Sequence, residues 1–151
     1  MRIALDQPRK LAPLLWVLLG LFVLRVGGQA LVAFGQVEFL PPMQEWHSGL
    51  LPYEVLLTSQ IIIIVLMTKV CIDFTRGVGP LVAPRRFLAV HWLYFGYLYL
   101  ATMIARYPIR LFLHPESRWF DGLIPIFFHW VLAIFVISVG LHHRNRLRKF
   151  I

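Results

Sequence analysis

Apolar residues are gathered into four long stretches along the chain, at about 11–34, 53–72, 87–106 and 122–141. Each has about 20 to 24 residues, and a helix rises about 1.5 Å per residue, so each can cross roughly 30 Å of hydrocarbon. Shorter segments with charged residues, proline and glycine separate them. The pattern predicts an all-α membrane protein, a bundle of four transmembrane helices.

Prolines and small polar residues mark the ends of these helices. Pro13 lies in the first turn of the first helix and Pro52 precedes the second, positions at which the missing N–H of proline is tolerated. We expect Pro108 to end the third helix, because proline interrupts the helical hydrogen-bond ladder. We expect Asp121–Gly122 to cap the start of the fourth helix.

The composition agrees with a chain that is solvated by lipid. Apolar residues make up 59% of the 151 residues and charged residues 15%, with a mean hydropathy of +0.72. Soluble domains are closer to half apolar and a quarter charged. The longest connection is under about 20 residues, whereas a domain needs about 50 or more. These figures exclude a soluble enzyme and predict a single transmembrane domain over residues 1–151.

Lys and Arg residues are unevenly divided between the two sides of the predicted membrane. With four spans both termini share a side, which carries eleven of them: Arg2, Arg9, Lys10, Lys69, Arg76, Arg85, Arg86, Arg144, Arg146, Arg148 and Lys149. The opposite side carries three: Arg106, Arg110 and Arg118. Positive residues favour the cytoplasmic side, so we expect both termini inside, in a prokaryotic inner (plasma) membrane. Anionic lipid headgroups then explain the net charge of +8 without nucleic acid as a partner.

The two predicted outer loops, Gly35–Pro52 and Tyr107–Asp121, are unusually apolar for segments outside a membrane. Each contains aromatic and aliphatic residues beside its acidic ones. We expect both loops to lie in the headgroup region or over the mouth of the bundle, with Trp46 at the interface.

Polar residues inside the spans are the candidates for function, because they are costly in lipid and usually face the bundle interior. Arg25 lies about nine residues, or roughly 13 Å, from the outer end of the first span. Gln29 follows one turn later, and Gly27 and Gly28 between them are expected to let a neighbouring helix approach closely. The other three spans bring polar groups to a similar depth. The predicted outer-leaflet layer consists of Arg25, Gln29, Gln60, Tyr99, Thr102 and His129.

This layer has two interpretations. Its residues can hold the helices together through mutual hydrogen bonds. Alternatively, they line a pocket in which Arg25 binds the anionic group of a lipid or of a lipophilic molecule. The predicted spans contain no acidic residue to neutralise Arg25 except Glu54 at the edge, so a loop carboxylate such as Glu38 or Glu45, a partner subunit or a ligand must do so.

The histidines form a second candidate site, for haem. His129 and His143 lie 14 residues apart on one face of the fourth span. This spacing resembles the helix of dihaem cytochromes b that supplies a ligand to each of two haems, which would imply a matching pair on a partner helix. The third span contains His91, but Ala105 stands at the position where the second haem ligand of the pair would be needed. One haem between His91 and His143 (or His142) remains open. In the alternative, His142 and His143 begin a basic tail, and His91 and His129 are hydrogen-bonded residues of the bundle.

Further chemistry is weakly indicated. His47, Glu45, His114 and Glu116 in the outer loops have metal-binding side chains but unspecific spacing. Cys71 is the one cysteine, which excludes an internal disulfide and is typical of a small buried residue. No set of nucleophile, base and acid lies at a common depth, so the sequence leans away from an enzyme.

Three function classes follow. The first is a non-catalytic subunit or accessory factor that packs against other membrane protein subunits, to which its 22 aromatic residues offer large contact faces. The second is a b-type haem or quinone protein that transfers electrons. The third is a small membrane enzyme or carrier for a lipophilic anion. We favour the first, since the second lacks a complete ligand set and the third lacks a nucleophile or an acid/base pair.

Overall fold

The computed structural model describes residues 7–35, 39–40, 46, 52–113 and 123–148. These residues form four long helices: α2 (Pro8–Gly35), α4 (Tyr53–Arg76), α5 (Arg86–Leu113) and α6 (Leu123–Leu147). Each of the four is long and apolar enough to cross a membrane. The prediction of an all-helical chain with four helices that can span a membrane is confirmed for the described residues.

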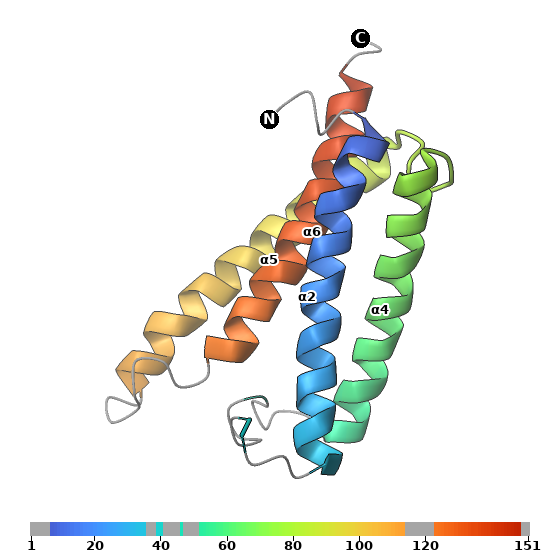
Figure 1. Ribbon diagram of the computed structural model, residues 1–151. Helices are drawn as coiled ribbons and strands as arrows, with labels where there is room; N and C mark the ends of the chain where they lie inside the picture. Colours follow the sequence, from blue (N-terminus) through green and yellow to red (C-terminus); the bar gives the residue numbers. More distant parts are fainter. Residues whose placement is uncertain (1–6, 36–38, 41–45, 47–51, 114–122, 149–151) are drawn as a thin grey trace.

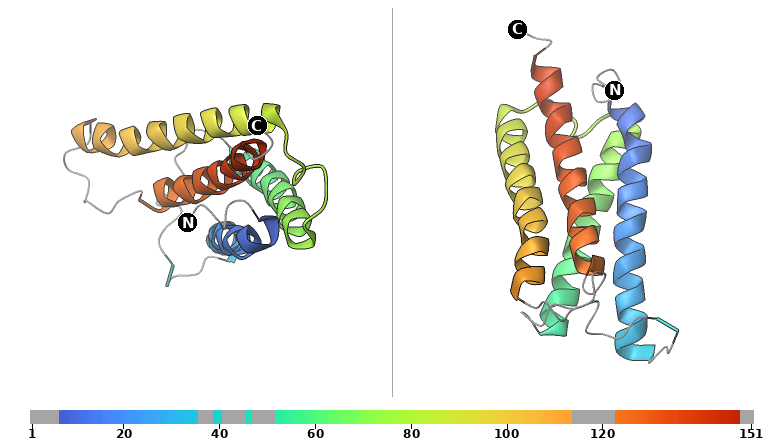
Figure 2. Two further views of the ribbon diagram at one scale, coloured as in Figure 1. Left: turned by 90° about the horizontal axis from the view of Figure 1, so that it is seen from above. Right: turned by 90° about the vertical axis from the view of Figure 1, so that its left-hand side faces the viewer.

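The helices are arranged as two antiparallel pairs (Figures 1 and 2). α2 packs against α4, α5 packs against α6, and α2 also contacts α6 and so joins the pairs. The third and fourth spans, α5 and α6, are therefore neighbours in the bundle. α2 begins and α6 ends at the same end of the bundle (Figure 1). The compartment that this end faces stays a prediction from the distribution of charge.

Large apolar side chains lie on the outside of the bundle as well as in its core. Val17, Leu24, Leu66 and Tyr94 are each more than half exposed, and the core between α2, α4 and α6 includes Leu15, Phe74 and Phe135. A soluble bundle keeps its outward face polar. Apolar residues on both sides of the helices are what a bilayer environment requires.

The α5–α6 pair is closest near Gly140. A Cβ atom at this position would lie 2.9 Å from Leu93 Cγ and 3.1 Å from the Leu93 backbone nitrogen. α5 and α6 spread away from α2 and α4 toward the end of the bundle opposite the termini (Figure 1). The bundle is therefore tight at the end that carries the termini and more open where the polar layer lies.

Three helices, α4, α5 and α6, extend well beyond their predicted C-terminal ends. α4 continues to Arg76, where Gly77 adopts a left-handed φ of 73° and donates its N–H to the Asp73 carbonyl at 2.8 Å. The extended helix includes an acidic residue, Asp73, that lies just past the predicted end of the span. Its buried carboxylate forms an ion pair with Lys69 one turn earlier.

α6 extends to Leu147, so it includes His142 and His143. Both histidine side chains are fully buried. The expectation that they begin a basic tail is wrong, because the backbone near Val82, in the connection between α4 and α5, packs over this end of α6. His142 Nε2 lies 3.3 Å from the Val82 carbonyl oxygen, and the His142 ring packs edge-on against Phe74.

The prediction that Pro108 ends the third helix is also wrong, because α5 continues through it to Leu113. An internal proline removes one hydrogen bond from the ladder. Ending the helix there would leave several carbonyl groups without partners in an apolar environment, which costs more. The proposed cap at Asp121–Gly122 lies outside the described residues.

Candidate functional site

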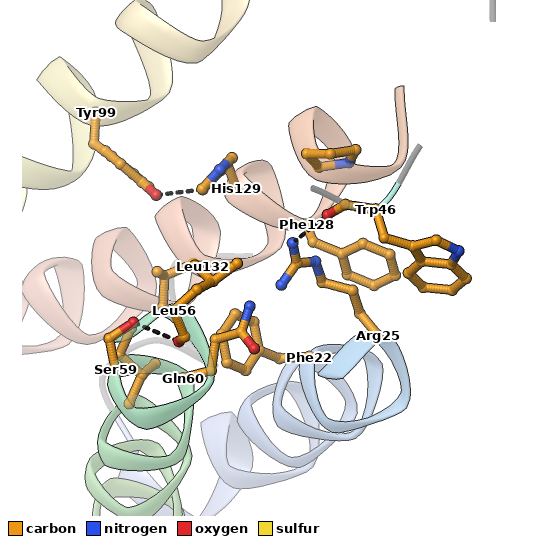
Figure 3. Close-up of a pocket in the computed structure, with 12 residues that line it drawn as sticks. Phe22, Arg25, Trp46, Leu56, Ser59, Gln60, Tyr99, Phe128, His129 and Leu132 are labelled. Atoms are coloured by element: carbon orange, nitrogen blue, oxygen red, sulfur yellow. Dashed lines mark hydrogen bonds between the residues drawn. The ribbon is translucent and has the colours of Figure 1, made fainter. Parts of the chain in front are cut away.

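A cavity of about 180 Å³ lies within the layer that the polar residues define (Figure 3). Arg25 and Gln60 extend into it from α2 and α4, and Tyr99 and His129 border it from α5 and α6. The remaining walls are mostly apolar; they are formed by Phe22, Trp46, Leu56, Ser59, Ile63, Pro125, Phe128 and Leu132. We call this cavity the polar pocket. Four of the six residues predicted for the outer layer line it.

A chain of hydrogen bonds connects α4, α2 and Trp46 beside the pocket. Gln60 Nε2 donates to Gln29 Oε1 at 3.1 Å, and Gln29 Nε2 donates to the Trp46 carbonyl at 3.4 Å. Arg25 Nη2 donates to the same carbonyl at 3.3 Å. Arg25 and Gln29 share this acceptor because residues four apart lie on one face of a helix. Gln29 therefore belongs to the site through its bonds, although it does not line the cavity.

Trp46 is buried against the bundle. Its side chain is only 8% exposed, and its ring lies on Gly28, where a Cβ atom would be 2.7 Å from Trp46 Cη2. Gly27 has open space around its Cα. Of the two glycines expected to face a neighbouring helix, Gly28 instead accommodates an indole ring from the segment after α2. Trp46 thus closes one side of the polar pocket.

The opposite side of the pocket is formed by a hydrogen-bonded pair across α5 and α6. The Tyr99 hydroxyl bonds to His129 Nδ1, and the two rings meet edge to face with centroids 5.6 Å apart. The structure thus brings these two predicted residues together. Thr102 is exposed and donates its hydroxyl to the Tyr99 carbonyl of its own helix. It does not line the pocket.

Arg25 is the charged group of the site and is only 7% exposed. Among the described residues no carboxylate forms an ion pair with it, and Glu54 is exposed at the start of α4. Glu38 and Glu45 lie outside the described part of the chain. Asp73 is 13 residues from Gln60 along α4, or about 20 Å, which is too far to neutralise Arg25.

Two buried polar atoms of the site have no hydrogen-bond partner within the described ranges: Arg25 Nε and Gln60 Oε1. A buried polar atom without a partner costs roughly 1–3 kcal/mol, and more when the group is charged. The pocket therefore offers a guanidinium donor, Arg25 Nε–H, and an amide acceptor, Gln60 Oε1, which needs an O–H or N–H donor. Carboxylate and phosphate groups match the guanidinium.

The structure places the candidate haem ligands in different surroundings. His91 is exposed; its ring stacks on Phe87 with centroids 4.0 Å apart, and its Nδ1 lies 2.9 Å from the Phe87 carbonyl oxygen. His143 is fully buried next to His142 and close to the backbone of the α4–α5 connection. His129 is bonded to Tyr99 at the polar pocket. Haem ligation by these residues stays a prediction.

The outer-loop histidines and acids proposed for a metal site, His47, Glu45, His114 and Glu116, lie outside the described residues. Within the part of the chain that is described, no three His, Cys, Asp or Glu side chains come together to hold a metal ion. Cys71 is fully buried, as expected for a small apolar residue.

No family model matches the chain, and no curated protein or solved structure is significantly similar to it. The helices themselves are compatible with a small integral membrane protein in a lipid bilayer. The more specific role must be argued from the polar pocket and the surfaces around it.

Proposed function

We propose that the protein is a non-catalytic integral membrane protein that binds the anionic group of a lipid or lipophilic small molecule in the polar pocket. One observation carries this proposal: Arg25 is buried in the wall of a cavity, with a free Nε and no described carboxylate beside it. A charged side chain near the middle of a membrane helix costs about 2.5–3.5 kcal/mol on insertion scales. A bound anion would offset that cost through charge-assisted hydrogen bonds.

Binding is favoured over catalysis because the hydroxyl and imidazole groups at the pocket are already engaged. The Ser59 hydroxyl donates to the Leu56 carbonyl at 2.7 Å, and Tyr99 and His129 bond to each other. A nucleophile has to be within hydrogen-bond reach of a base, and Ser59 is bonded to its own helix instead. The pocket thus supports recognition of charge rather than covalent chemistry.

A second role, as a subunit of a larger membrane assembly, is favoured by the outer face of α5. Within the 18-residue apolar segment of α5 that can span the membrane, only 11% of the residues are buried, against 44% in the corresponding segment of α6. This face displays the aromatic side chains of Tyr94, Phe95 and Tyr97, which are each about half exposed or more. Aromatic residues provide large contact areas and specific ring geometries. We propose α5 as the helix through which such an assembly would form.

Native mass spectrometry of the protein, extracted in mild detergent, tests the binding proposal. Wild-type protein should retain an anionic amphiphile that organic extraction releases, and Arg25→Gln should not. Arg86→Gln, which removes an exposed cation at the other end of the bundle, is the matched control and should retain it. Equal retention by the wild type and Arg25→Gln, or retention by neither, would contradict the proposal. A visible spectrum of the same sample tests the haem alternative.

A further inference from the structure

A second cavity, of about 260 Å³, lies beside the polar pocket and is lined entirely by apolar and aromatic residues. Its walls come from α4, α5 and α6: Ile63, Leu66, Met67, Val70, Trp92, Phe95, Leu132, Phe135 and Val136. We call it the apolar groove. Ile63 and Leu132 line both the polar pocket and the apolar groove, so the two cavities are adjacent and these two side chains lie between them.

The apolar groove opens sideways toward the surrounding lipid. Leu66 and Phe95 stand at its rim on α4 and α5, and they are 61% and 54% exposed. Within the described ranges, the α4 backbone packs closely against α2 alone, so no helix backbone closes the space between α4 and α5. The polar pocket, by contrast, is bordered by the buried side chain of Trp46. Access from the lipid is therefore less obstructed than access past Trp46.

The groove is elongated and leads away from the buried charge. Along α4 the lining residues extend from Gln60 in the polar pocket to Val70 in the groove, ten residues or about 15 Å. Along α5 they extend from Tyr99 to Trp92 in the same direction. A molecule that occupied both cavities would have a polar end at Arg25 and an apolar body beside Trp92.

The sizes of the cavities also favour one ligand that spans both. Pockets for small molecules commonly measure roughly 300–1,000 Å³. The polar pocket and the apolar groove, at about 180 and 260 Å³, each fall below this range, and together they fall within it. At about 260 Å³, the volume of the groove favours a single hydrocarbon chain over the two chains of a common phospholipid.

We propose that the ligand is a single-chain lipophilic anion, with its carboxylate or phosphate at Arg25 and its hydrocarbon chain in the apolar groove. The ligand enters between α4 and α5 from the bilayer. This inference rests on the proposed function and adds the ligand class and its route. It also explains why a cavity built around a charge lies next to one that has no polar lining.

The hydrocarbon chain of the ligand should affect the position of the bound ligand more than its affinity. Lipid tails are as apolar as the groove, so moving a hydrocarbon chain from the bilayer into the groove gains little hydrophobic free energy. An affinity series over chain length would mostly report partitioning into the membrane. A positional experiment is therefore the sharper test.

The probe is dodecyl phosphate with a diazirine at the end of its chain. It is added to the full-length protein in phosphatidylcholine nanodiscs, and the residues it labels on irradiation are mapped by mass spectrometry. We expect labelling of groove residues such as Met67, Trp92 and Phe135. Arg25→Gln should abolish that labelling, because the phosphate is no longer held.

Two matched pairs of variants test the route. Ile63→Trp fills the junction between the cavities and should abolish groove labelling, whereas Ile62→Trp on the exposed side of α4 should leave it unchanged. A second pair repeats the comparison at exposed positions, so that no packed residue is altered. Leu66→Trp lies at the open rim of the groove, and Val65→Trp is the similarly exposed control outside the groove lining. Circular dichroism and gel filtration verify the fold of each variant.

The failures of the two proposals are distinguishable. Uniform labelling of lipid-facing residues that Arg25→Gln does not change would overturn the proposed function and this inference with it. Labelling that depends on Arg25 but falls outside the groove, for example on the apolar hollow beside Ile124 and Phe127, would overturn this inference alone. So would groove labelling that both Ile63→Trp and Leu66→Trp leave intact.

Discussion

The carbonyl oxygen of Trp46 lies 3.3 Å from Nη2 of Arg25 and accepts a hydrogen bond from it. This bond joins two residues 21 positions apart, one in the middle of a membrane helix and one in the segment that follows it. Gln29 donates to the same oxygen. A carbonyl dipole stabilises the guanidinium but does not neutralise it, so the site remains cationic.

The packing of Trp46 on Gly28 leads to a prediction about stability. Gly28→Ala should lower the free energy of unfolding by about 1–3 kcal/mol, because the new methyl group overlaps the indole ring. Gly27→Ala is the matched control on the neighbouring residue, which has open space, and alanine favours a helix there by up to about 1 kcal/mol. Thermal unfolding in detergent measures both. Equal melting temperatures for the two variants would show that Trp46 does not pack there.

Variants of Arg25 should distinguish how much its positive charge and how much its planar guanidinium contribute to ligand binding. Saturating dodecyl phosphate should raise the melting temperature of the wild type, since a ligand at 100 times its Kd stabilises the folded state by about 2.7 kcal/mol. Arg25→Lys should show a smaller rise because the planar fork is lost, and Arg25→Leu should show none. Dodecanol, which has no charge, is the control ligand. A full rise in Arg25→Leu would mean that Arg25 only extends toward the lipid headgroups.

The hydrogen bond between Tyr99 and His129 should contribute measurably to the α5–α6 pairing. Tyr99→Phe removes the hydroxyl that bonds to His129 Nδ1, and we expect a loss of about 0.6–1.5 kcal/mol in the free energy of unfolding. Tyr94→Phe, at an exposed position on the same helix, should change it little. Denaturation in mixed micelles compares them. The pair would be judged dispensable if both variants unfolded like the wild type.

The charge distribution predicts the sidedness of the bundle. In a Cys71→Ala background, Gln7→Cys and Asn145→Cys should react with an impermeant thiol reagent only after cells are permeabilised, because their end of the bundle carries most of the Lys and Arg residues. Phe39→Cys, at an exposed position four residues past the end of α2 and so at the other end of the bundle, should react in intact cells. The opposite labelling pattern would reverse the assigned orientation.

The haem alternative has a simple optical test. We expect protein purified in mild detergent to show no Soret band, since the His91 ring is held on its own helix. His91→Ala should then change stability by no more than about 1 kcal/mol, the contribution of one hydrogen bond. Stoichiometric haem in the wild type that is lost in His91→Ala would instead establish the electron-transfer class.

The sequence by itself determined the number of helices, their approximate positions and the depth of their polar residues. These properties are local, since about 20 consecutive apolar residues form a membrane helix whatever they pack against, and the rise per residue sets the depth of each side chain. This is why Gln60, Tyr99 and His129 could be assigned to one layer with Arg25. The positions of the helix ends were less certain. α4 continues to Arg76, where Gly77 caps its last turn, and α6 continues to Leu147, because the connection between α4 and α5 covers its last turns.

Only the tertiary structure decided which of these residues meet and what lies between them. The rotation and spread of the helices depend on contacts such as Gly140 with Leu93, which join residues 47 positions apart and leave no periodic signal. The same holds for Trp46 on Gly28, for the bond from Gln60 to Gln29, and for the groove that α4 leaves open toward α5 and α6. Lipid solvates the apolar faces of a helix about as well as a neighbouring helix does, so hydrophobicity alone does not select which helices pair. Side-chain packing between distant segments decides these contacts instead.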